Sequence, residues 1–183
     1  GKGGMAAIIR LDKNIIEEIC QKVEGVCEIA NYNSPLQIVI SGEKDAIKEA
    51  VNLAKDEGAL KAIELDVSGP FHSSLMGAAR DKLAEEINKI TFNKPNMPIV
   101  TNVSADFTED INKIKDQLLA QLTHSVRWEE SMRTMIDHGI DTFIEVGPGR
   151  ILKGLMRRID KSVDVYNVYD KNSFDKTIKK IKE

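Results

Sequence analysis

A histidine lies where a strand-like run of residues meets a helical pattern. The run ends at Val67, a Gly69-Pro70 turn follows, and His72 stands directly before serines that can begin a helix. In α/β folds, ligand sites collect at the carboxyl ends of strands. The positive end of a helix dipole favours a neutral imidazole, which can act as a base. His72 is therefore our first candidate for a general base, and a histidine that only caps the helix or packs in the loop is the alternative.

Two other turns contain residues that could bind a ligand. Residues 145–150, Glu-Val-Gly-Pro-Gly-Arg, join a strand to a helix, where glycines allow close backbone approach and a helix N-terminus favours anions. Their spacing is not that of a Walker or dinucleotide loop, so a tight structural turn is equally compatible. In residues 31–35, Asn-Tyr-Asn-Ser-Pro, the amides could orient a carbonyl or thioester, although formation of an Asx turn is the alternative.

The sequence offers a base without an evident nucleophile. It contains no Gly-x-Ser-x-Gly elbow, and Ser104 and Ser131 lack the flanking glycines of one. Cys20 lies on the apolar face of a predicted helix and Cys27 in a strand-like run, with no matching histidine cluster. We therefore expect two buried free thiols in a reducing compartment, with neither a zinc site nor a disulfide.

The remaining two histidines are weaker candidates. His124 follows a predicted helix, and His138 precedes a glycine near a helix C-terminus, where a cation is favoured. Both positions are typical of surface or capping histidines. No histidine, cysteine or carboxylate pair has the spacing of metal ligands, so we expect no metal site.

The elements that must position His72 fall into two regions of different predicted topology, and the first region is residues 1–67. Strands are expected at 5–11, 26–31, 37–40 and 60–67, with helices after Asp12 and after Ser41, each of which is a suitable N-cap. In the last strand, Ile63, Leu65 and Val67 are expected on one side. The order β-α-β-β-α-β predicts a ferredoxin-like subdomain, with two helices covering one face of a four-stranded antiparallel sheet.

Residues 68–183 alternate strands with helices, which predicts a parallel α/β sheet. Expected strands are 99–103, 141–146 and 163–168, and helical periodicity is found after Ser73 or Ser74, over 111–122, after Trp128, and over 151–159 and 174–181. A parallel sheet is normally covered on both faces and usually has more than about three strands. This half is therefore expected to be incomplete by itself.

Charge and hydropathy restrict the classes of partner. The net charge of −3 gives no general reason to bind nucleic acid, and the lysine-rich stretch near the C-terminus is interrupted by Asp175. That stretch is more typical of a solvated helix face than of a nucleic-acid-binding arm. No apolar run reaches the ~18 residues of a membrane span, and no signal-peptide pattern is present. We expect a cytoplasmic protein with neither nucleic acid nor membrane as a partner.

Taken in order along the whole chain, the motifs resemble the C-terminal part of the malonyl-CoA:acyl carrier protein transacylase family. The stretches that carry the resemblance are residues 4–8, 31–42, 67–73, 121–122, 126–128 and 145–149. The resemblance implies an acyltransferase that loads malonyl groups for fatty acid biosynthesis. It also implies two subdomains: residues 1–67 as the small ferredoxin-like one, and residues 68–183 as the C-terminal part of a large α/β-hydrolase-like one.

The resemblance also assigns roles to individual residues. His72 matches the histidine that activates a nucleophilic serine, and Gln121 the glutamine whose backbone carbonyl orients the imidazole. Phe71 matches the malonyl-selective form of the motif. Asn31 and Asn33 match the edge of the acyl pocket that the small subdomain contributes.

The family's serine, its malonyl-binding arginine and the glutamine of its oxyanion hole are all expected upstream of Gly1, since none matches within this chain. The missing N-terminal segment is thus an expected partner, beside malonyl-CoA and acyl carrier protein, and the isolated chain is expected to be inactive. No cofactor is implied, because both acyl carriers are substrates. A non-catalytic module that binds CoA or the carrier protein, and an acyltransferase of a polyketide pathway, are the alternatives.

Overall fold

The computed structural model describes residues 3–182, so Gly1, Lys2 and Glu183 lie outside the description. Gly1, the reference point for the expected upstream segment, is therefore outside the described residues. The chain divides into two compact units, Gly1–Ser131 and Met132–Glu183, and each is described by itself.

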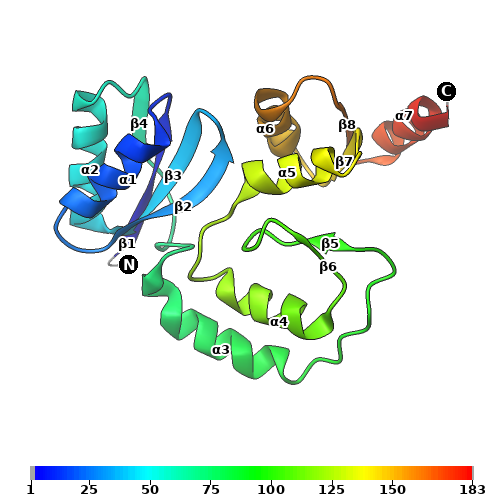
Figure 1. The fold of residues 1–183 in the computed structure, drawn as a ribbon, viewed down its shortest axis with the longest axis horizontal. Coiled ribbons are helices and arrows are strands. Elements are labelled where there is room, and N and C mark those ends of the chain that lie inside the picture. The colour runs from blue at the N-terminus through cyan, green and yellow to red at the C-terminus, as the bar shows by residue number, and fades with distance from the viewer. Residues whose placement is uncertain (1–2, 183) are drawn as a thin grey trace. The chain divides into compact units, whose positions relative to one another are not determined.

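The first unit is built around a four-stranded antiparallel sheet with the order β2-β3-β1-β4 (Figure 1). The strands and helices follow one another along the chain in the predicted order β-α-β-β-α-β. Their bounds are β1 Gly3–Ile9, α1 Lys13–Lys22, β2 Cys27–Ser34, β3 Gln37–Glu43, α2 Lys44–Asp56 and β4 Lys61–Glu64.

The core of this unit lies between the sheet and the apolar faces of α1 and α2. Ile8 of β1 and Ile40 of β3 point to the same side of the sheet, where Ile16 and Ile47 of the two helices cover them. All four are 1 % exposed or less. Burying an isoleucine side chain contributes roughly 1.5–3 kcal/mol. This alternation in the strands and helical spacing in α1 and α2 is the pattern that the sequence predicted.

The start of α1 also agrees with the sequence, whereas the start of α2 does not. The Asp12 carboxylate accepts a hydrogen bond from the amide of Asn14 at 2.8 Å and caps α1. Ser41 was expected to cap α2, but it lies inside β3, and α2 begins at Lys44. The strand continues because Gly42 pairs with Gly4 on one side and Cys27 on the other, and a Cβ at Gly42 would collide with the Val26 carbonyl.

The last strand is shorter than the expected 60–67, so Leu65 and Val67 lie beyond its end. In β4 the buried side chain is Ala62, at 6 % exposed, whereas Ile63 is 53 % exposed and Leu65 and Val67 are both 37 % exposed. β4 pairs only with β1 and is therefore an edge strand of the sheet.

Past β4 the first unit continues through short elements. They are a 3-10 helix at Ser74–Met76, α3 Gly77–Ile87, β5 Ile99–Val100, β6 Phe107–Thr108 and α4 Ile111–Ala120. The parallel strand expected over 99–103 is instead a two-residue strand that pairs antiparallel with β6, a strand that was not expected. The run stops there because a turn follows, in which Ala105 has a φ of +54° and its amide bonds the Thr101 carbonyl at 2.9 Å.

The second unit has a parallel pair of strands with helices around it. The unit boundary falls inside α5, Trp128–Asp137, after which come β7 Thr142–Val146, α6 Ile151–Ile159, β8 Asp164–Val168 and α7 Lys171–Lys182. β7 and β8 pair in parallel from Thr142 opposite Asp164 to Val146 opposite Val168. The strand–helix–strand alternation predicted for this part is therefore present, with two strands.

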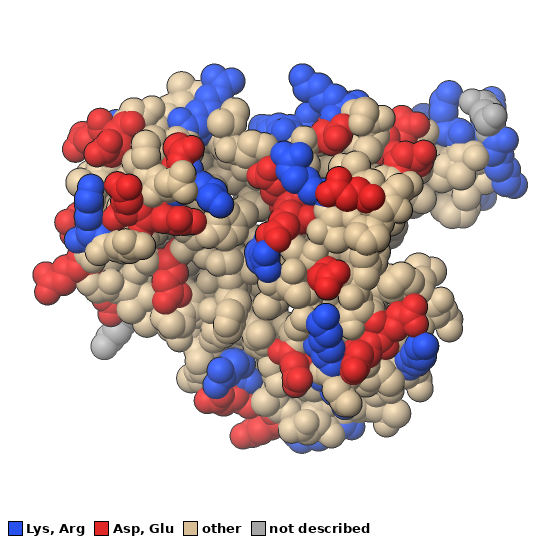
Figure 2. All heavy atoms as spheres, viewed as in Figure 1, with Lys and Arg blue, Asp and Glu red and all other residues tan. Residues whose placement is uncertain are grey.

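The surface carries charges of both signs. On the face that Figure 2 shows, acidic and basic side chains are intermixed over most elements, and lysines gather on α7. The lysines of α7 are exposed, as expected for a solvated helix face. Within residues 3–182, none of the helices has the length and apolar character needed to span a membrane.

Candidate active site

His72 is held in an unusual backbone conformation. Its φ of +58° lies in the left-handed region, which costs a non-glycine residue roughly 1–3 kcal/mol and persists only where surrounding contacts impose it. The next residue, Ser73, is fully buried, and its hydroxyl donates to the Pro70 carbonyl at 2.6 Å. The Ser73 carbonyl in turn accepts from the Met76 amide at 3.0 Å, which begins the helix. The Gly-Pro turn and the buried serine thus fix the backbone on both sides of His72.

The imidazole of His72 is directed at the end of α4. Its Nδ1 lies 2.8 Å from the backbone carbonyl oxygen of Gln121, the residue that follows α4. A carbonyl oxygen can only accept, so Nδ1 carries the proton and donates it. The side-chain amide of Gln121 is 3.4 Å from Nδ1 but donates at 3.0 Å to the His124 carbonyl. In the neutral ring this arrangement places the free lone pair on Nε2.

The loop after Gln121 is tied to β2, which is one of the two edge strands of the sheet. The Val126 amide donates to the Ala30 carbonyl at 2.8 Å, and the Val126 carbonyl accepts from the Tyr32 amide at 2.9 Å. Val126 thereby makes a parallel bridge with Asn31, and the Ser125 hydroxyl donates to the Ile29 carbonyl. The sheet therefore holds the segment whose Gln121 carbonyl orients His72.

β2 also holds the helix that follows His72. The Glu28 carboxylate accepts a hydrogen bond from the backbone amide of Ser74 at 2.7 Å. A carboxylate at the first free amide of a helix gains from both the hydrogen bond and the helix dipole. One strand thus contacts both sides of the His72–Gln121 pair, Glu28 on the histidine side and Ala30 to Tyr32 on the glutamine side.

His72 opens into a cavity of about 440 Å³ within the first unit. The cavity is lined by residues of α1, β2 and the loop after α4, among them Glu17, Cys20, Cys27, Tyr32 and Thr123. The Tyr32 hydroxyl donates to the Glu17 carboxylate at 3.4 Å. Burial, together with the negative charge of Glu17, raises the pKa of Tyr32. The cavity wall therefore has a polar group at Tyr32, and the thiols of Cys20 and Cys27 also line it.

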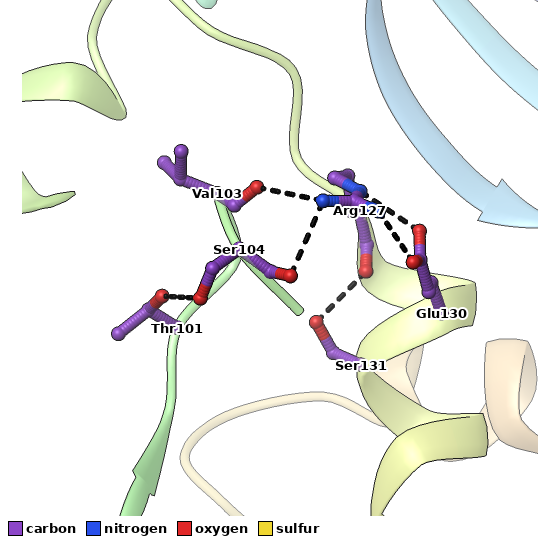
Figure 3. Close-up of polar contacts among 6 residues, drawn as sticks. All are labelled: Thr101, Val103, Ser104, Arg127, Glu130 and Ser131. Atoms are coloured by element: carbon purple, nitrogen blue, oxygen red, sulfur yellow. Dashed lines mark hydrogen bonds and ion pairs between the residues drawn. The ribbon is translucent and has the colours of Figure 1, made fainter. Parts of the chain in front are cut away.

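An arginine fixes the start of α5 to the turn that follows β5 (Figure 3). One nitrogen of the Arg127 guanidinium donates to the carbonyls of Val103 and Ser104, at 3.3 and 3.2 Å. The other side of the group pairs with the carboxylate of Glu130. The Arg127 carbonyl accepts from the Ser131 hydroxyl at 2.8 Å. Val126, the preceding residue, is bridged to Asn31 of β2, so the segment is held by β2 on one side of Arg127 and by the 103–104 turn on the other.

The Gly-Pro-Gly turn has no free anion site at the start of its helix. Gly147 and Gly149 have φ values of +138° and +86°, which glycine adopts readily. The Glu145 carboxylate accepts from the amides of Leu152 and Lys153, both at 3.1 Å, so it occupies the N-terminus of α6. Of the two interpretations of this motif, the structure supports the tight structural turn.

The other two histidines make local backbone contacts. Nδ1 of His124 lies 2.9 Å from the Ala120 carbonyl, and Nδ1 of His138 lies 2.7 Å from the Thr134 carbonyl, each one turn earlier in the chain. Such contacts are typical of histidines at helix ends. No group of three or more potential metal ligands is found among the described residues 3–182.

Comparison with known proteins identifies the family. The model of the acyl transferase domain family matches residues 1–175 of this chain. The chain belongs to the acyl transferase domain family. It is 41 % identical over 186 residues to a malonyl CoA-acyl carrier protein transacylase of Bacillus subtilis, covering 100 % of this chain and 59 % of that protein.

Solved structures of acyl transferase domains agree with this assignment. A malonyl CoA-acyl carrier protein transacylase of Clostridium perfringens superposes with a TM-score of 0.94 at 42 % identity, over 100 % of this chain and 58 % of that one. A malonyl-transacylase solved in complex with a type II PKS acyl-carrier protein gives 0.95 at 37 % identity, over 98 % and 59 %. The chain thus spans about three fifths of the length of these relatives.

Within this acyl transferase domain, the structure brings together only some of the predicted site residues. His72 and Gln121 are in contact, and Asn31 lies on β2 at the bridge to Val126. Asn33 lies two residues further along β2, and Phe71 precedes His72 with 38 % of its surface exposed. Glu28, which supports the helix after His72, could not be found from the sequence, because a single glutamate in a strand gives no signal of its contact with residue 74.

Proposed function

We propose that this chain is the C-terminal part of a malonyl-CoA:acyl carrier protein transacylase, which transfers malonyl groups to acyl carrier protein in fatty acid biosynthesis. The observation that carries the proposal is the 2.8 Å contact between His72 Nδ1 and the Gln121 carbonyl, which leaves Nε2 available as a base. The names and identities of the relatives support the malonyl substrate and the carrier protein.

In this mechanism His72 is the general base and Gln121 the residue that orients it. Nε2 takes the proton of a serine hydroxyl as the serine oxygen bonds to the thioester carbon. When the carbon–sulfur bond breaks, the proton passes to the departing CoA thiolate, and the carrier-protein thiol then enters by the reverse of these steps. A neutral carbonyl at Nδ1 fixes the ring and its tautomer without placing a buried charge beside it.

The acyl pocket would be completed by residues on either side of the His72 pair. Asn31 and Asn33 on β2, and Phe71 next to the base, are the residues that we assign to its wall. Asn31 is suited to this because its backbone is held against Val126, in the segment that also carries Gln121. Phe71 is suited because its ring is partly exposed one residue from the base.

We assign residues 1–67 to a ferredoxin-like small subdomain and residues 68–183 to the C-terminal part of an α/β-hydrolase-like large subdomain. The order of elements and the strand order β2-β3-β1-β4 support the first assignment. The parallel pair β7 and β8 supports the second. Ile144 and Val146, on one face of β7, are 47 % and 79 % exposed, whereas parallel sheets are normally covered on both faces.

The remaining partner in this proposal is the N-terminal segment of the same enzyme, which would supply the serine nucleophile, the malonyl-binding arginine and most of the oxyanion hole. The coverage of 58 % and 59 % of the relatives leaves room for such a segment. Malonyl-CoA and acyl carrier protein are substrates, and no cofactor takes part in the steps above. A cytoplasmic location is proposed, as suits a pathway that uses CoA thioesters.

The direct test is transfer activity with and without the N-terminal segment. The chain alone should form no malonyl-enzyme with malonyl-CoA, whereas the full-length enzyme should form one and produce malonyl carrier protein, both detected by intact mass. In the full-length enzyme His72→Ala should lower the transfer rate by about 10²–10⁴-fold, the usual contribution of a general base. Gln121→Ala retains the backbone carbonyl and should cost far less.

His138→Ala is the matched control, because His138 bonds a carbonyl of its own helix, and the rate should be unchanged. A malonyl adduct on the chain alone would show that the nucleophile lies within these residues. Carrier-protein binding that survives His72→Ala, with no transfer by the full-length enzyme, would favour a non-catalytic module. Better transfer of methylmalonyl or acetyl groups than of malonyl would favour a polyketide-type enzyme.

A further inference from the structure

Two cysteines that the acyl-transfer mechanism does not use lie side by side in the first unit. The Cys27 thiol donates to the Cys20 sulfur at 3.4 Å. Cys20 belongs to α1 and Cys27 is the first residue of β2, so they come from different elements joined by a short connection. Both are free, Cys27 being buried and Cys20 partly so. The two cysteines are seven positions apart in the sequence and lie in different elements, so the sequence did not indicate that their thiols would be in contact.

Both thiols line the 440 Å³ cavity that also contains His72, so small molecules in that cavity can reach them. The side chains around the pair are acidic or uncharged, with Glu17 and Glu28 nearby. We propose that Cys20 and Cys27 form a redox-reactive dithiol, which a hydroperoxide converts into an intramolecular disulfide in the wall of this cavity. This inference does not depend on the proposed acyltransferase function.

The reaction needs one thiolate and one neutral thiol, and the geometry provides both. When Cys27 loses its proton, the direction of this hydrogen bond reverses, and the Cys20 thiol donates to the Cys27 thiolate, which lowers the pKa of Cys27. The same contact, together with burial and the charges of Glu17 and Glu28, raises the pKa of Cys20, because a second thiolate would face the first. Cys27 is thus the attacking sulfur and Cys20 the thiol that resolves the intermediate.

In the first step the Cys27 thiolate attacks an oxygen of the hydroperoxide. A sulfur–oxygen bond forms, the oxygen–oxygen bond breaks, and the leaving oxygen takes a proton as water or an alcohol. In the second step the Cys20 sulfur attacks Cys27, the sulfur–oxygen bond breaks, and hydroxide leaves with the Cys20 proton as water. The hydroperoxide is reduced by two electrons, and the two thiols are oxidised by two.

The second step requires little movement. The sulfurs must approach from 3.4 Å to the ~2.05 Å of a disulfide bond. Cys20 lies in the last turn of α1, which ends at Lys22, where a side chain can shift without breaking the helix. Cys27 is held by pairing with Gly42, so most of the adjustment is expected at Cys20.

The test is thiol chemistry on the reduced 183-residue chain, treated with hydrogen peroxide and then alkylated in denaturant. The two free thiols should fall to none, with a mass decrease of two hydrogens and a peptide that joins residues 20 and 27. Dithiothreitol should restore both. A product with two alkylatable thiols, with added oxygen, or with a disulfide between chains would overturn the proposal.

Single variants test the assigned roles. Cys20→Ser should stop at a Cys27 sulfenic acid that dimedone traps, because the resolving thiol is gone. Cys27→Ser should slow the loss of the remaining thiol by about tenfold or more, because Cys20 then lacks the partner that makes a thiolate. Cys27→Ala repeats this with a smaller apolar side chain, and circular dichroism confirms that each variant is folded. Equal oxidation rates of Cys20→Ser and Cys27→Ser would refute the roles assigned to the two thiols.

Discussion

The antiparallel sheet of β1 to β4 and the parallel pair β7 and β8 differ in how completely they bury their apolar side chains. The sheet of β1 to β4 has a core in which Ile8, Ile16 and Ile40 are 1 % exposed or less. In the unit of β7 and β8 the buried hydrophobic residues are those of α5 and α6, such as Met132 and Met156, while Ile144 and Val146 of the strand itself are 47 % and 79 % exposed. Both regions combine strands with helices, but only in the first are the apolar side chains of the sheet buried by residues of the same unit.

The difference follows from the way each sheet is connected. An antiparallel sheet of four strands needs helices on only one face to build a core, and α1 and α2 supply them within 64 residues. In a parallel pair of strands, a single crossover helix covers only one face. The other face and the two outer strand edges must be covered by residues from elsewhere. The general consequence is that the first unit should be stable alone, whereas the second should gain stability from whatever covers β7.

Hydrogen exchange should show the largest effect of this difference. β1 and β3 are the two central strands of their sheet, each paired on both sides. Their amides should exchange only by global unfolding, with an opening free energy of ~5 kcal/mol or more. Amides of β7 and β8 should exchange through local opening at a much lower free energy. Mass spectrometry of peptides from each unit measures both. Equal protection in the two sheets would contradict the comparison.

Truncating matched isoleucines should reproduce the difference in a single residue. Ile40→Ala, at a site that is 0 % exposed, should lower the free energy of unfolding by about 2–5 kcal/mol, through lost burial and the cavity left behind. Ile144→Ala, at 47 % exposed, should change it by less than about 1 kcal/mol. Urea titration followed by circular dichroism gives both values.

The same two variants can also be compared in the proposed full-length protein. If an N-terminal segment covers β7, Ile144→Ala should become several-fold more costly there than in the isolated chain, while the effect of Ile40→Ala should stay the same. An unchanged effect of Ile144→Ala would mean that this face of β7 stays open in the longer protein.

Helix capping gives a smaller effect, present in both units. The Asp110 carboxylate accepts from the amides of Asn112 and Lys113, at 2.8 and 3.1 Å, at the start of α4. Asp110→Ala should lower the free energy of unfolding by about 1 kcal/mol, and Asp110→Asn, which keeps an acceptor, should lower it by less. Glu145→Ala in the second unit should destabilise α6 but hardly change the main transition, if the first unit dominates unfolding.

Much of the first unit could be predicted from the sequence because its signals are local. Alternation in the strands, helical spacing in α1 and the Asp12 cap each depend on residues a few positions apart. Where prediction was wrong, the deciding contact was distant. Ser41 continues β3 because Gly42 fits between two strands, and β5 is short because its partner, β6, lies beyond an intervening turn.

The site divides in the same way. A histidine after a Gly-Pro turn is visible as a candidate base, but its partner Gln121 is 49 residues away, and only the family resemblance pointed to it. Neither pattern nor resemblance suggested that Glu28 holds the helix after His72, or that Cys20 and Cys27 meet. These contacts are between single side chains of ordinary type, which leave no periodic trace in the sequence.

The smallest predicted effect concerns pH and a tyrosine of the first unit. Burial and the nearby Glu17 carboxylate raise the pKa of Tyr32 above its usual value near 10. The unfolded chain therefore loses this proton at a lower pH than the folded one, and the stability that it represents, full below about pH 10, is lost as pH rises toward the folded pKa. Tyr32→Phe should flatten this alkaline decline, and Tyr169→Phe, at an exposed position of the second unit, should not. Urea midpoints measured from pH 8 upward provide the comparison, and an identical decline in wild type and Tyr32→Phe would show that Tyr32 is not shielded in the fold.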